Sequence, residues 1–142
     1  MTLIVKKVTQ LIVGLIFLYG IYIVTHGHLT PGGGFAGGAV IAGAFVLLVL
    51  AYGSDILKLR KREEGSSVVE STGIFIFLVL AFTALFIGTR IFFTNYLPKG
   101  ITGELISAGV IPLYNIAVGI EVAAALFTIF LALVIYKEEV LK

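Results

Sequence analysis

Cysteine and charged residues are what this sequence lacks most. None of its 142 residues is a cysteine, which excludes disulfide bonds, thiolate metal sites, thiol redox centres and cysteine-ligated iron–sulfur clusters. Only 13% of the residues are charged, and 10 basic and 8 acidic side chains leave a formal net charge of +2. Such a charge is too small for a nucleic-acid binder that relies on a large basic surface.

Hydrophobic residues, in contrast, make up 59% of the chain, and its mean hydropathy is +1.13. Soluble domains carry about 45–50% apolar and about 25% charged residues, and disordered chains are less hydrophobic still. The composition therefore excludes both classes. It predicts a small polytopic protein of the cell membrane, folded as one domain.

The apolar residues gather in four runs, each long enough to cross a bilayer as a helix of about 20 residues. None of the runs sustains the period-2 alternation that indicates membrane strands. The sequence therefore predicts an all-α membrane protein with four transmembrane helices in a single domain, residues 1–142. The predicted helices cover residues 8–25, 35–57, 68–93 and 110–136.

The connecting segments are predicted to be loops. Residues 26–34 end in three consecutive glycines after Pro31, which disfavour helix. Residues 58–64, KLRKREE, are the only dense charge cluster and are predicted to be a solvated loop. The glycine pattern from Gly32 to Gly37 matches a dinucleotide-binding fingerprint in letters only, because no strand precedes it. We expect it to form a sharp turn with close backbone contacts.

Basic residues predict the orientation of the helices. Cytoplasmic loops of membrane proteins carry an excess of lysine and arginine. With a cytoplasmic N-terminus, eight basic residues lie inside and only Arg90 and Lys99 lie outside. Both termini and residues 58–67 are therefore predicted to be cytoplasmic, and residues 26–34 and 94–109 to face outward. The eight inside residues are Lys6, Lys7, Lys58, Arg60, Lys61, Arg62, Lys137 and Lys142.

Small residues recur at helical spacing in the last three runs. The second run has a small residue at every fourth position, at Gly34, Gly38 and Ala42. The fourth run has a similar pair, Gly119 and Ala123, also four residues apart. Such stripes let helix backbones approach closely in a membrane. They are explained either by packing between the chain's own helices or by packing against other subunits, and four helices alone leave many faces to cover.

Glu121 is the most informative single residue because it lies near the middle of the fourth run. A charged side chain at the bilayer centre costs about 2.5–3.5 kcal/mol on insertion scales. The carboxyl is therefore either a proton or cation station, to which the Thr128 hydroxyl adds an oxygen, or a protonated group that hydrogen-bonds a neighbouring helix. Its helix face is small or polar throughout: Tyr114, Ala117, Ala124, Ala125 and Thr128.

The remaining polar residues give weaker signals. His26 and His28 have no third ligand nearby and so predict no metal site; they either respond to protons at the outer mouth of an ion path or make ordinary loop hydrogen bonds. Arg90 either snorkels to the headgroups or pairs with an acid of a neighbouring chain. Asp55 and Glu70 are expected at the membrane interface.

Two segments carry a family resemblance. HGHLTPGGGFAGG at 26–38, between two membrane helices, and IPLYNIAVGIEVAAALF at 111–127 resemble the MnhB or MrpB family, which supplies one subunit of the multisubunit Na+/H+ antiporters. The resemblance covers about residues 8–136. It implies an integral subunit without a cofactor, with other membrane subunits, lipid, Na+ and H+ as partners and no nucleic acid. The same subunit type recurs in membrane-bound hydrogenases and related ferredoxin-linked complexes, where a redox reaction drives the module. In the first motif, the residues expected to serve the turn and helix packing are Pro31, Gly32, Gly33, Gly34, Gly37 and Gly38.

Three functions compete. The first is an ion-translocating subunit of an antiporter, and the second is a subunit that only seals and positions others. The third, a small multidrug exporter, would carry its glutamate in the first helix, where this chain has no acid. An enzyme is disfavoured because no set of polar residues has catalytic spacing.

Overall fold

The computed structural model describes residues 2–53, 56–87, 91–104 and 107–140 of the chain. These residues form four α-helices and no strand: α1 (Leu3–Thr25), α2 (Gly33–Tyr52), α3 (Ile56–Phe86) and α4 (Ile111–Val140). Each helix has an apolar stretch long enough to cross a membrane. The prediction of an all-α protein with four spans is confirmed.

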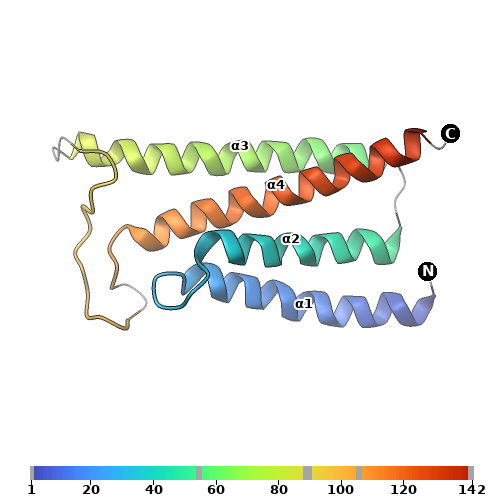
Figure 1. The fold of residues 1–142 in the computed structure, drawn as a ribbon, viewed down its shortest axis with the longest axis horizontal. Helices are drawn as coiled ribbons and strands as arrows, with labels where there is room; N and C mark the ends of the chain where they lie inside the picture. Colours follow the sequence, from blue (N-terminus) through green and yellow to red (C-terminus); the bar gives the residue numbers. More distant parts are fainter. Residues whose placement is uncertain (1, 54–55, 88–90, 105–106, 141–142) are drawn as a thin grey trace.

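The helices lie side by side in one layer, in the order α1, α2, α4, α3 (Figure 1). Neighbours within each hairpin, α1–α2 and α3–α4, run antiparallel, whereas α2 and α4 run in the same direction. Helices α1 and α3, as far as the structure describes them, do not pack on each other. As a result, 39% and 33% of the apolar windows of α2 and α4 are buried, against 11% and 17% for α1 and α3.

Most of the buried residues between the helices are alanine or glycine. Ala42, Ala44 and Ala51 of α2 are buried, as are Ala81 and Ala84 of α3. Larger side chains meet where α2 and α4 approach their C-terminal ends, in a cluster of Val49, Leu131 and Ile135. The chain is therefore held together mainly by close backbone approach, which is typical of membrane helices.

The prediction that the charged segment 58–64 is a loop was wrong, because this segment is helical. Helix α3 begins at Ile56, twelve residues before the predicted start, and carries Arg60–Glu64 in its first turns. Leucine, lysine, arginine and glutamate are strong helix formers, so the helix continues out of the apolar region. Helix α1 likewise extends back to Leu3, through Lys6 and Lys7, and α4 continues through Lys137 to Val140.

Two other predicted helix boundaries are also wrong. Helix α2 ends at Tyr52, not at 57, because Gly53 adopts a positive φ of 74° and terminates the helix. Helix α3 ends at Phe86, and Phe93, predicted to be helical, has a φ of 59°, which lies in the left-handed region.

The triple glycine departs in part from the predicted loop. Gly32 is not helical, as expected, but Gly33 and Gly34 form the first turn of α2. The intrinsic cost of a helical glycine is roughly 0.5–1 kcal/mol, and tertiary packing routinely exceeds such propensities. Here the packing partner of Gly34 is the backbone of α4 at Asn115.

Candidate functional site

Glu121 lies on the seam between α3 and α4, directly opposite Gly73. A Cβ atom added at Gly73 would lie 2.8 Å from the Glu121 Cβ and 3.0 Å from its Cα and amide nitrogen. Only glycine permits so close an approach. Gly73 therefore lets the backbone of α3 lie directly against Glu121 of α4. The importance of Gly73 was not predicted, because the sequence alone does not show which helices are neighbours.

The carboxyl of Glu121 has no hydrogen-bond or ion-pair partner among the described residues. The side chain is half-buried, and it makes no hydrogen bond or ion pair with any residue that the structure describes. On the face expected for it, Ala117 and Ala124 are buried, and Tyr114, Ala125 and Thr128 are half-buried. The carboxyl thus leaves a small-residue seam with its oxygens free for a proton, an ion, water or another subunit.

Thr128 and Ser66 share one backbone acceptor near this site. The Thr128 hydroxyl donates to the carbonyl oxygen of Ala124 at 2.9 Å, and the Ser66 hydroxyl of α3 donates to the same oxygen at 2.9 Å. Each hydroxyl proton is thereby used, while the lone pairs of its oxygen stay available. Ser66 was not foreseen, because its partner lies on a helix 58 residues away.

Tyr114 lies nearer the N-terminal end of α4 on the same seam, about 10 Å along the helix from Glu121. Its ring packs edge-on against Phe77 at 5.2 Å and is tilted against Phe93 at 5.8 Å. Its hydroxyl is buried and finds no hydrogen-bond partner among the described residues. The aromatic cluster anchors the ring and leaves a polar group to be satisfied from elsewhere.

The two histidines do not form a common site. The His26 ring stacks on Tyr22 at 4.2 Å, and its Nδ1 lies 3.0 Å from the Tyr22 carbonyl oxygen. His28 instead reaches the connection between α3 and α4, with Nε2 3.4 Å from the Glu104 carbonyl oxygen and Nδ1 buried without a partner in the described chain. Among the described residues no three metal-ligating side chains gather. Arg90 and Asp55 lie outside the described residues, and Glu70 is half-buried on α3.

The glycines of the turn divide between two helix contacts. A Cβ at Gly37 would lie 2.8 Å from the Gly20 carbonyl oxygen of α1, whereas one at Gly38 would lie 2.7 Å from the Gly119 carbonyl oxygen of α4. Gly34 likewise abuts the Asn115 carbonyl oxygen of α4. The motif therefore joins three helices.

The turn itself depends on glycine and on one unforeseen side chain. Gly32 and Gly33 have φ values of 141° and 70°, which favour glycine, while Pro31 is exposed. The Asn115 amide of α4 lies against Gly27 and Gly33, so it braces the turn from the neighbouring helix. Nothing in the sequence singles out Asn115 except that it is polar in an otherwise apolar helix start.

Comparison with known proteins shows which protein family this chain belongs to. A family model described as a domain related to the MnhB subunit of Na+/H+ antiporters matches residues 4–128. The chain belongs to the MnhB family. The family assignment made from the two motifs is thus confirmed, and the polytopic location in the cell membrane follows from it and from the four apolar helices.

Proteins similar to this MnhB-family chain include antiporter subunits of about the same length and two longer proteins. Proteins named antiporter subunit mnhB2 include one from Staphylococcus haemolyticus, 28% identical over 92% of each chain. An uncharacterized protein of Methanocaldococcus jannaschii is 43% identical over 77% of this chain but only 43% of its own length. The solved membrane-bound sulfane sulfur reductase, an archaeal respiratory membrane complex, has a chain that matches with a TM-score of 0.72 and 32% identity. That match covers 91% of this chain and 56% of the other, so the chain spans about half the length of these two longer proteins.

Proposed function

We propose that this MnhB-family chain is an integral membrane subunit of a multisubunit Na+/H+ antiporter module, and that it contributes to both ion translocation and assembly. The observation that carries the ion-translocating part is the Glu121 carboxyl, which leaves the α3–α4 seam opposite Gly73 without a partner in the described chain. The subunit needs no cofactor and catalyses no reaction of its own in this proposal.

The proposed chemistry is exchange at one carboxyl group. An ionised carboxylate in the apolar part of a membrane is costly, so it is neutralised by a proton or by a cation. One carboxyl that accepts H+ or Na+, but not both, couples the two ions. Na+ is a hard cation that prefers oxygen ligands, and the lone pairs of the Thr128 hydroxyl are one source of them. Tyr114, His26 and His28 are further candidates for a path toward the outward loops.

The proposed orientation has both termini in the cytoplasm. The start of α1 and the end of α4 lie at the same end of the helix layer (Figure 1), as four spans require. The cluster Arg60–Arg62 and Lys137 belong to the same end, whereas Lys99 belongs to the long loop at the other. The excess of positive charge at the terminal end supports a cytoplasmic assignment.

A purely structural role in a redox-driven complex is the second candidate. It is supported by the similarity to a chain of an archaeal respiratory membrane complex. In that setting other subunits would carry the redox chemistry, and this chain would seal and position its neighbours. The two candidates differ in what they require of Glu121.

Exchange of Glu121 for glutamine separates the candidates. Glu121→Gln keeps the shape and hydrogen-bonding capacity of the side chain but cannot carry charge. We expect the assembled complex to lose Na+-dependent proton transport by tenfold or more, on the order of 1.4 kcal/mol, whereas Glu121→Asp retains part of it. Transport is measured by fluorescence quenching in membrane vesicles at matched complex levels.

The matched control is Glu64→Gln, the same exchange at an exposed position in the charged first turns of α3. It should transport like the wild type. If Glu121→Gln also transports normally, Glu121 is only a packing residue and the structural candidate stands.

A further inference from the structure

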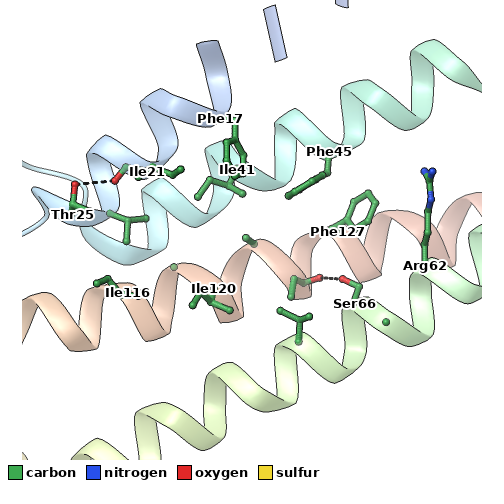
Figure 2. A pocket seen from close by; sticks show the side chains of 16 residues that line it. Phe17, Ile21, Thr25, Ile41, Phe45, Arg62, Ser66, Ile116, Ile120 and Phe127 are labelled. Atoms are coloured by element: carbon green, nitrogen blue, oxygen red, sulfur yellow. Dashed lines mark hydrogen bonds between the residues drawn. The ribbon is translucent and has the colours of Figure 1, made fainter. Parts of the chain in front are cut away.

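A cavity of about 630 Å³ lies on one face of the helix layer, and all four helices contribute to its lining (Figure 2). Its floor is α4, where Gly119 and Ala123 provide no bulk, and its sides come from α1, α2 and α3. Glu121 does not line it. The cavity is therefore separate from the proposed ion site.

The surface of this cavity is almost entirely apolar. Phe17, Phe45 and Phe127 form a continuous row of rings, with centroid separations of 5.9 and 5.6 Å. The two hydroxyl groups in the lining are already engaged: Thr25 donates to the Ile21 carbonyl oxygen at 3.0 Å, and Ser66 to that of Ala124 (Figure 2). A ligand in the cavity is thus chosen by apolar contact along most of its length.

Arg62 supplies the exception, at one end. Its side chain extends from α3 past α4 toward α2 (Figure 2), and its guanidinium makes no hydrogen bond or ion pair with the described residues. It also borders a second cavity beside Tyr52, the last residue of α2. Arginine near a helix end snorkels to the membrane surface, and its planar fork binds phosphate through two hydrogen bonds.

The length of the cavity matches half a membrane. From Ile116 to Phe127 its floor runs about 16 Å along α4, close to the roughly 15 Å of one leaflet's hydrocarbon, half of the ~30 Å core. A transmembrane helix of a partner would need about twice that length. An apolar trough about as long as an acyl chain, with a cation at one end that no described residue pairs, is complementary to an acyl chain that bears an anionic headgroup.

We propose that this cavity holds one acyl chain of a phospholipid whose phosphate is bound by Arg62. The lipid would fill this trough on the face of the layer, contact both edge helices, α1 and α3, and so hold them at a fixed separation. This proposal does not depend on ion translocation through Glu121.

The test uses the assembled complex in phosphatidylcholine vesicles that contain a little phosphatidylglycerol with a photoactivatable diazirine in its acyl chain. After illumination, mass spectrometry locates the labelled peptides. We expect labelling of the α4 segment from Ile116 to Phe127. Arg62→Gln should lower that labelling several-fold by removing the phosphate ligand, and Gly65→Phe should lower it several-fold by filling the trough.

Each variant has a matched control. Lys61→Gln removes the same charge one residue earlier, at an exposed position that does not line the cavity. Gly14→Phe adds the same ring to a helix where, as at Gly65, an added Cβ meets no atom within 4 Å. Both controls should label like the wild type. Labelling that is absent from this segment, or that survives both Arg62→Gln and Gly65→Phe, would overturn the proposal.

Discussion

The contact between α2 and α4 makes a quantitative prediction at Gly38. In Gly38→Ala the new Cβ would lie 2.7 Å from the Gly119 carbonyl oxygen, 2.9 Å from the Val122 Cβ and 3.2 Å from the Ala123 amide nitrogen. Two of these atoms belong to the backbone, so no side-chain rotation relieves the contact. The helices must separate by several tenths of an ångström, and overpacking of this kind costs about 1–3 kcal/mol.

Gly43→Ala is the matched control for this prediction. Gly43 lies in the same helix, and a Cβ there meets no atom within 4 Å. Both exchanges gain the helix propensity of alanine over glycine, about 0.5–1 kcal/mol, so this gain cancels in the comparison. The variants should therefore differ in stability by about the full overpacking cost of 1–3 kcal/mol.

The assay is loss of the folded chain from the purified complex during titration with a denaturing detergent. Gly38→Ala should dissociate or unfold at a lower detergent fraction than the wild type, and Gly43→Ala at the same or a higher one. Equal midpoints for the two variants would refute the close α2–α4 approach, and with it the placement of the glycine motif on that seam.

Three further predictions follow from the packing and the charges. Cysteines at Glu64 and Thr102, both exposed, should label from opposite sides of the membrane with an impermeant maleimide; labelling from one side would exclude four spans. Glu64 is chosen over the nearby Ser66, because the Ser66 hydroxyl donates a hydrogen bond to α4. Gly34→Val, whose Cβ alone would already clash with the Asn115 carbonyl oxygen, should reduce the amount of assembled complex more than it changes Na+ affinity, as read from co-purification and from transport at varied Na+. The chain expressed without other subunits should give little monodisperse protein in mild detergent, and a stable lone monomer would contradict the need for partners.

Helix number and the small-residue stripes could be predicted from the sequence because they depend on local chemistry. A bilayer core admits only runs of about 20 apolar residues, and glycine or alanine at every fourth position marks a face where a membrane helix packs closely. The stripe of Gly34 and Gly38 does face another helix, α4. Helix ends were predicted less well, since the end of an apolar run marks the membrane boundary and not the end of the helix, as Arg60–Glu64 illustrates.

Contacts between helices could not be predicted, because they depend on which helices are neighbours. The residues on the face of Glu121 can be named from helical spacing alone, but the residue packed against it, Gly73, follows only from the α3–α4 pairing. The histidine pair shows the same limit: His26 and His28 are two residues apart, but one turns back to Tyr22 and the other reaches Glu104. Proximity in sequence does not bring loop side chains together.

The exposed apolar faces of α1 and α3 do not by themselves require partner subunits, because lipid tails are as apolar as the side chains they cover. Polar groups give the stronger argument for partner subunits.

Four polar groups have no hydrogen-bond partner among the described residues: the Glu121 carboxyl, the Tyr114 hydroxyl, the Asn115 amide nitrogen and the His28 Nδ1. A buried polar group left unsatisfied costs free energy, several kcal/mol where it lies in hydrocarbon, so we expect water, ions or neighbouring subunits to reach these groups. All three groups other than Glu121 lie at the end of the fold that holds the α1–α2 loop, at the start of α4 or in the loop after α1. Lipid alone cannot satisfy that end of the subunit, and it is there that we expect the other chains of the complex, or the water of an ion path, to meet it.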